Sequence, residues 1–250
     1  MSSQRGRVRV EDGPKRVRVQ LGGVWVADTT RVKLVWEIPY FPTYYFHPDD
    51  VALDSLVATG ESYRSPSRGS ADLYTVKAGG SEAENAARVW TGAEFDEIDG
   101  HVSFKWAAMD AWFEEDEEVF VHPRDPYSRI DILQSSRHVE VVVNGVKVAD
   151  SHQPRFLFET NLPTRYYLPK TDVRMDLLTP TDTMTACPYK GNAEYWSVEA
   201  DGERFEDIAW GYRFPLAESI SVAGYVCFYN EKVDTYIDGE LEERPKTKFG

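Results

Sequence analysis

The amino-acid sequence predicts a mainly β protein made of two tandem copies of one domain, with antiparallel sheets and few short helices. Matching residues recur at a constant spacing over most of the chain, and two-residue turn sequences separate alternating apolar runs. Aromatic residues make up 13% of the chain, with 14 tyrosines and 7 tryptophans. That content is typical of β-sheets or of a cavity lined by rings.

The internal repeat has an offset of 122 residues, the distance from Val17 to Val139. This offset holds without a gap as far as Gly80 and Gly202, and after an insertion it becomes 124. The matched residues include Glu37 with Glu159, Tyr44-Tyr45 with Tyr166-Tyr167, Asp50 with Asp172, Pro66 with Pro188, Val102 with Val226, Phe104 with Phe228 and Asp110 with Asp234. Because chance does not keep this register, we predict two similarly folded halves.

Two hairpins are expected in each copy. Gly22-Gly23 and Asn144-Gly145 predict turns of type I′, because both central residues of that turn need a positive φ. A second pair of turns is expected at Gly79-Gly80 and Asp201-Gly202. A helical turn with an aspartate as its N-cap is expected at Asp50 and Asp172, and a short helix from about residue 215 to 223.

The two copies are expected to form separate domains. We place the N-terminal copy at residues 1–125 and the C-terminal copy at residues 137–250. Residues 126–136, which begin with Pro126 and contain Ser135-Ser136, are expected to be a linker.

Composition narrows the expected partners and compartment. A formal net charge of −14 argues against nucleic acids and anionic membranes. Residues 1–5 lead into no apolar segment, and no stretch approaches membrane-spanning length, so a soluble cytoplasmic protein is expected. Cys187 and Cys227 are the two cysteines and imply no disulfide framework. A monomer and a homodimer both remain open.

Several motifs of the C-terminal copy carry a family resemblance. They are Gly145-Val146-Lys147-Val148-Ala149-Asp150-Ser151, Glu159, Tyr166-Tyr167-Leu168-Pro169, Asp172-Val173, Asp176-Leu177-Leu178, Cys187-Pro188-Tyr189-Lys190-Gly191, Ala193, Tyr195-Trp196 and Ala209-Trp210-Gly211-Tyr212. With these motifs the chain resembles the bacterial domain-of-unknown-function 427 family, also labelled nucleotidyltransferase-like. The resemblance implies a β-tent fold in each half, similar to that of methionine-R-sulfoxide reductases. The residues lack the Gly-rich phosphate cradle and the paired aspartates that nucleotidyl transfer would need.

Three residues of the C-terminal copy are candidates for chemistry. Cys187 would be a nucleophile if the nearby Lys190 favours its thiolate, or else a packed apolar cysteine. Lys190 would alternatively hold a ligand anion as a point charge. Glu159 ends an apolar strand, so it would be a general base, a ligand anchor, or a carboxylate held by backbone or arginine partners. The N-terminal copy has Ser65 and Arg68 in place of the cysteine and the lysine.

Aromatic residues of the C-terminal copy are expected to line a ligand pocket; they are Tyr166, Tyr167, Tyr195, Trp196, Trp210 and Tyr212. The histidines show no metal-ligand spacing, so neither a metal nor another cofactor is expected. The first functional hypothesis is metabolite binding in this pocket. The alternative is a small-molecule enzyme that uses Lys190, Cys187 and Glu159, and a scaffold without a pocket is a third hypothesis.

Overall fold

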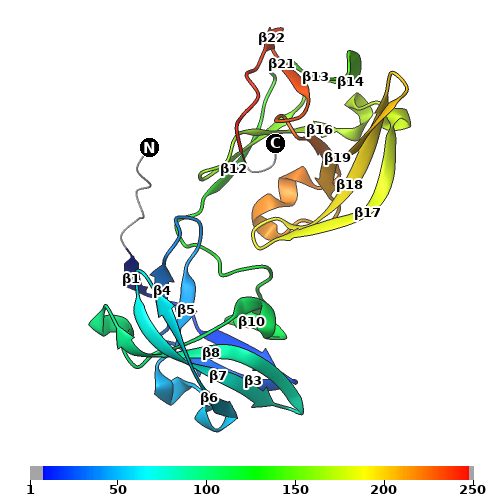
Figure 1. Ribbon diagram of the computed structural model, residues 1–250. Helices are drawn as coiled ribbons and strands as arrows, with labels where there is room; N and C mark the ends of the chain where they lie inside the picture. Colours follow the sequence, from blue (N-terminus) through cyan, green and yellow to red (C-terminus); the bar gives the residue numbers. More distant parts are fainter. Residues whose placement is uncertain (1–7, 248–250) are drawn as a thin grey trace. The chain divides into compact units, whose positions relative to one another are not determined.

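The computed structural model describes residues 8–247 of the chain. The chain divides into two compact units, residues 1–125 and 126–250 (Figure 1). Within residues 8–247 there is no helix with the length and apolar character needed to cross a membrane. The expectation that no apolar leader is present concerns residues 1–5, which lie outside the described part of the chain.

Short strands and single turns of 3-10 helix (η) build the N-terminal unit. They are β1 (Arg9–Asp12), β2 (Val17–Leu21), β3 (Val24–Thr29), β4 (Lys33–Trp36), β5 (Thr43–Tyr45), η1 (Pro48–Asp50), η2 (Leu53–Ser55), β6 (Leu56–Ser65), β7 (Gly69–Ala78), β8 (Ser81–Ala93), η3 (Asp96–Ile98), β9 (Val102–Phe104), η4 (Trp106–Ala108), β10 (Ala111–Glu114) and β11 (Glu117–Glu118).

The C-terminal unit repeats this order of elements, except that η4 has no counterpart among its elements. They are β12 (Ile130–Gln134), β13 (Val139–Val143), β14 (Val146–Ser151), β15 (Arg155–Glu159), β16 (Arg165–Pro169), η5 (Lys170–Asp172), η6 (Met175–Leu177), β17 (Leu178–Cys187), β18 (Gly191–Ala200), β19 (Glu203–Tyr212), η7 (Ala217–Val222), β20 (Tyr225–Phe228), β21 (Asp234–Ile237) and β22 (Glu240–Leu241). The mainly β class with short helices is confirmed, and η7 lies within the expected helix at 215–223.

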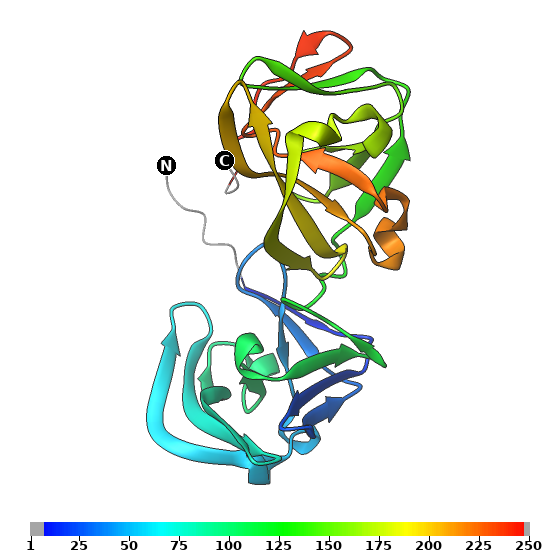
Figure 2. The ribbon, with the colours of Figure 1, turned by 90° about the vertical axis from the view of Figure 1, so that its right-hand side faces the viewer.

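Antiparallel pairing connects the strands into two sheets in the C-terminal unit. One sheet has seven strands in the order β12-β15-β16-β20-β19-β18-β17, and the other has four in the order β14-β13-β21-β22. In the N-terminal unit the long sheet is divided into β1-β4-β5 and β6-β7-β8-β9, which a single bridge between Phe46 and Val102 joins. Strands β6 to β8 curve strongly around their unit (Figure 2).

The hairpin turns have the backbone geometry that the sequence predicts. Gly22 and Gly23 have φ of 58° and 74°, and the matching residues Asn144 and Gly145 have 46° and 78°. Two consecutive positive φ values are the mark of a type I′ turn, whose twist suits the strands it joins. The N-cap prediction is wrong for both aspartates, because Asp50 ends η1 and Asp172 ends η5. Each accepts a hydrogen bond from a hydroxyl of the first hairpin, Asp50 from Thr29 at 2.8 Å and Asp172 from Ser151 at 2.6 Å.

Strand register confirms the repeat and corrects its last part. Phe104 lies opposite Ala87 as Phe228 lies opposite Ala209, which supports the offset of 124. On the four-stranded sheets, however, Val17 faces Glu114 and Val139 faces Ile237, so the offset there is 123. The predicted match of Asp110 with Asp234 is therefore wrong by one residue, because the loop before these strands is one residue shorter in the C-terminal unit.

The expected linker at residues 126–136 contains a strand. β12 pairs with β15 in the C-terminal unit as β1 pairs with β4 in the N-terminal unit. Its residues are Ile130–Gln134, and Ile130 and Ile132 pack against buried side chains of that unit. The apolar isoleucines explain why this segment joins the sheet, so the connection between the units is shorter than expected.

Each unit has two apolar clusters, one on each face of its long sheet. The larger cluster combines residues of both sheets, as Val141 and Trp196 do in the C-terminal unit. The smaller cluster draws on the opposite face of the long sheet, where Tyr167 and Tyr212 lie. Successive residues of a strand point to opposite faces, so neighbours such as Tyr166 and Tyr167 enter different clusters.

Candidate functional site

The six aromatic residues expected to line one pocket are divided between the two faces of the seven-stranded sheet. Tyr166 and Trp196 pack in the larger cluster. The other four pack in the smaller cluster; they are Tyr167, Tyr195, Trp210 and Tyr212. All six are at least nine-tenths buried. The six therefore do not all line a single cavity, and most of their surface is packed against protein.

Lys190 and Glu159 form an ion pair at the edge of the smaller cluster. Lys190 Nζ donates to Glu159 Oε2 at 2.5 Å, and about a tenth of each side chain is exposed. Glu159 follows Leu157 by two positions on β15, so its side chain points to the same face as that buried leucine. The pair satisfies a carboxylate that would otherwise be costly at this depth.

The N-terminal unit has the same pair with a different cation. Arg68, at the position of Lys190, bonds to Glu37, at the position of Glu159, and its side chain is 2% exposed. Ser65, at the position of Cys187, donates a hydrogen bond to Glu37 Oε1 at 3.1 Å. Because both units keep a cation and a carboxylate here, the geometry favours the structural interpretation of Glu159.

The two cysteines lie in different surroundings. Cys227 is completely buried on β20, and burial raises the pKa of its thiol to about 12. Cys187 ends β17 and is partly exposed. Burial, followed by an electrostatic effect of Cys187, raises the pKa of Tyr212. Of the two thiols, Cys187 is the one that reagents can reach.

A pocket of about 230 Å³ opens beside β18, the end of β19, the start of β20 and Lys170 at the start of η5. Its lining consists of Lys170, Glu194, Trp196, Gly211, Tyr212, Arg213, Gly224 and Tyr225. Lys170 Nζ lies 5.1 Å from the centroid of the Trp196 ring, within the range of a cation–π contact. Within residues 8–247, neither Lys170 nor Arg213 forms an ion pair.

Gly211 shapes the wall of this pocket. A Cβ atom there would lie 2.4 Å from the carbonyl oxygen of Tyr225 and 3.4 Å from the Trp196 ring. The N-terminal unit has Val89 at this position of the register, opposite Asp72, which accepts a hydrogen bond from Thr91 at 3.0 Å. The pocket with two cations is therefore particular to the C-terminal unit.

Sequence reasoning did not find Lys170 and Arg213. They are 43 positions apart and follow β16 and β19, which become neighbours only through β20. Of the expected ligand residues, Trp196 and Tyr212 line the pocket, whereas Lys190 lies away from it. The signal that could have found the cations is the difference between the copies, since Pro48 and Thr91 stand at the matching positions.

Each half of the chain is thus an antiparallel β domain with a cation–carboxylate pair; among residues 8–247 the strands form two sheets in the C-terminal unit and three in the N-terminal unit. The family model described as "Domain of unknown function (DUF427)" matches residues 9–115 and 131–239. The chain belongs to this family and contains two tandem copies of its domain, which confirms the resemblance. Among curated proteins, no sequence matches the chain.

Proposed function

We propose that the C-terminal copy binds a small anionic metabolite that contains a planar ring, in the pocket formed by Lys170, Trp196 and Arg213. One observation carries the proposal: two cations without ion-pair partners among residues 8–247 line the same pocket as Trp196. Because the chain as a whole has a net charge of −14 and repels anions, an anionic ligand should bind at this local pair of cations in preference to the rest of the surface.

The lining suggests how such a ligand would be held. The Arg213 guanidinium offers a fork of N–H donors that suits a carboxylate or phosphate, and Lys170 adds a mobile positive charge. Glu194, on the same wall, would accept a hydrogen bond from a hydroxyl or amino group of the ligand. The volume of about 230 Å³ is below the range of about 300–1,000 Å³ that is usual for drug-sized ligands, which favours a small metabolite.

Thermal-shift screening of the full chain against small aromatic carboxylates and phosphates tests this proposal. A ligand at 100 times its dissociation constant stabilises the folded state by about 2.7 kcal/mol. The variants Lys170→Gln and Arg213→Thr, the latter with the residue of the N-terminal copy, should abolish the shift. Arg174→Gln is the matched control, because Arg174 is an exposed cation outside the pocket that pairs with Asp176. A shift that survives in Arg213→Thr would contradict the proposal.

Catalysis by Cys187, Lys190 and Glu159 is the alternative function. Its support is that the Cys187 thiol is partly exposed. Against it, Lys190 is engaged with Glu159, as Arg68 is with Glu37. If screening finds a reaction, Cys187→Ser should abolish turnover; undiminished turnover would exclude this alternative.

The compartment and the partners are predictions of the same proposal. Both cysteines are free, which suits a reducing cytoplasm, and cell fractionation measures the location. We expect neither nucleic acids nor anionic membranes as partners, because the net negative charge repels their phosphates. Sedimentation of the full chain would decide between a monomer and a homodimer.

A further inference from the structure

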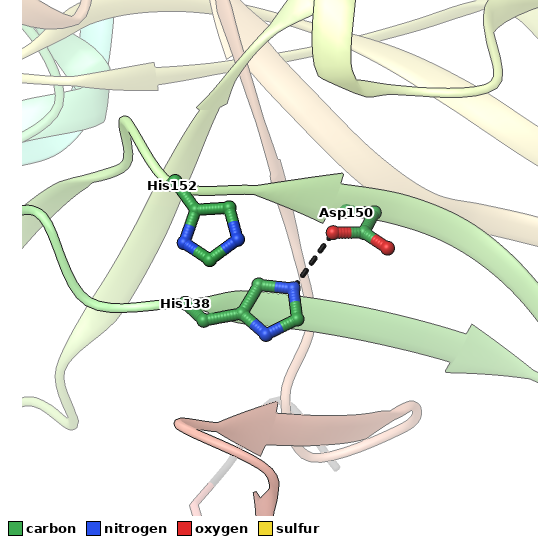
Figure 3. A group of neighbouring side chains, drawn as sticks. All are labelled: His138, Asp150 and His152. Carbon is green, nitrogen blue, oxygen red and sulfur yellow. Dashed lines mark hydrogen bonds and ion pairs between the residues drawn. The ribbon is translucent and has the colours of Figure 1, made fainter.

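His138, Asp150 and His152 converge on the first hairpin of the C-terminal unit (Figure 3). Val139 at the start of β13 lies opposite Ser151 at the end of β14, so His138 and His152 flank this last pair and face each other. Asp150 precedes His152 by two positions and shares its face. The histidines are 14 residues apart, which is not a recognised spacing for metal ligands, and only the antiparallel pairing of β13 with β14 brings them into contact.

The possible ligand atoms of the three side chains lie close together. One imidazole nitrogen or carboxylate oxygen from each residue falls within 4.8 Å of the others. The two rings stack with centroids 4.2 Å apart, and His138 Nε2 lies 2.7 Å from Asp150 Oδ1. Ligand atoms in a tetrahedral zinc site with bonds of about 2.0–2.1 Å are about 3.3 Å apart. Rotation of the exposed His152 and Asp150 side chains would provide the remaining contraction.

The surrounding charges are compatible with a metal cation. Lys147 Nζ lies 2.7 Å from Asp150 Oδ2 and also bonds to Glu140, so it leaves Oδ1 directed at the imidazoles. Glu140 Oε2 lies 3.9 Å from His138 Nδ1. With neutral histidines, Asp150, Glu140 and Lys147 sum to one negative charge. Arg137, the other nearby cation, is paired with Asp238 at 2.7 Å.

The N-terminal unit shows that this corner of the fold accommodates a cation. Arg16, at the position of His138, donates from Nε to Asp28 Oδ1 at 2.7 Å, and Asp28 matches Asp150. Thr30 stands at the position of His152. The C-terminal unit has thus kept the aspartate, replaced the guanidinium and added a second imidazole. Two nitrogen donors and one carboxylate are a ligand set that zinc and related ions bind.

We propose that His138, Asp150 and His152 bind one divalent transition-metal ion, with Zn²⁺ as the reference ion. Each imidazole contributes one nitrogen, Asp150 contributes Oδ1, and water completes the coordination. Lys147 holds the second carboxylate oxygen and orients Asp150 toward the ion. The site is independent of the proposed metabolite pocket, because the two share no residue.

Titration of the untagged, metal-free full chain with Zn²⁺ tests the proposal. Calorimetry measures the binding directly, and displacement of bound Co²⁺ by Zn²⁺ is monitored through the Co²⁺ absorbance. We expect one ion per chain. Loss of an orienting partner typically weakens metal affinity 10–100-fold, so loss of a direct ligand should weaken it at least about 100-fold. His152→Thr and His138→Arg introduce the residues of the N-terminal copy and should both show this loss.

Two further variants keep the test decisive. His47→Ala is the control, because His47 is a histidine beside an aspartate in the N-terminal unit, 3.3 Å from Asp49, and zinc binding should not change. Asp150→Asn replaces a ligand with an isosteric amide and should weaken binding even if a histidine variant fails to fold. Lack of saturable binding, or equal affinity in Asp150→Asn and the unmodified chain, would overturn the proposal.

Discussion

Replacement of Lys190 by methionine should destabilise the C-terminal unit by leaving Glu159 buried without its partner. At the observed 2.5 Å and an effective dielectric constant of about 20, the Coulomb attraction of the pair is about 7 kcal/mol. Desolvation of both ions removes several kcal/mol of this gain. Breaking a buried pair by removing one partner costs about 3–5 kcal/mol, and we expect the lower end because a tenth of each side chain is exposed.

A double-mutant cycle measured by urea denaturation of the full chain tests this magnitude. Lys190→Met should lower the free energy of unfolding by about 3 kcal/mol, and adding Glu159→Leu should recover most of the loss, because no charge is then left buried. Lys190→Arg, which reproduces the cation of the N-terminal copy, is the control and should stay close to the unmodified protein. A Lys190→Met variant as stable as the original chain, or additive effects in the cycle, would refute the structural role of the pair.

Three other predictions concern the turns and the thiols. Gly79→Asp should destabilise the N-terminal unit by about 1–3 kcal/mol in urea denaturation, because a Cβ there would lie 1.8 Å from the Gly22 carbonyl oxygen. The control is Asp201→Gly at the corresponding turn of the C-terminal unit, which should have a much smaller effect. Iodoacetamide should modify one thiol of the native chain and two after unfolding, and Cys187→Ser should leave none reactive in the native state. Because burial raises the pKa of Cys227 from 9.0 to about 12, the folded state holds this proton more tightly, so its contribution to stability is complete below pH 9 and declines between pH 9 and 12. The difference in unfolding free energy between the original chain and Cys227→Ser should therefore change over that window and stay constant below it.

The sequence predicted what depends on local chemistry. The turns at Gly22-Gly23 and Asn144-Gly145 follow from the need for positive φ. The spacing of matching residues identified the duplication, which strand register then confirmed.

The candidate sites depend on contacts between strands that are distant in sequence. Lys170 and Arg213 reach one pocket only because β20 lies between β16 and β19. Likewise, the register of β13 on β14 places His138 opposite His152. For Lys190 the sequence suggested a thiolate or a ligand anion as the partner, whereas its nitrogen donates to Glu159.

The bridge between Phe46 and Val102 is a weak junction between two parts of the long sheet in the N-terminal unit. Two backbone hydrogen bonds of 2.8 Å, one in each direction, close this junction, whereas β16 and β20 pair over three residues in the C-terminal unit. Local opening of a β-ladder needs less free energy where fewer hydrogen bonds must break together. Amide protons at Phe46 and Val102 should exchange with solvent sooner than those at Leu168 and Val226. The C-terminal unit should accordingly open less readily at this junction of its long sheet than the N-terminal unit does at the matching place.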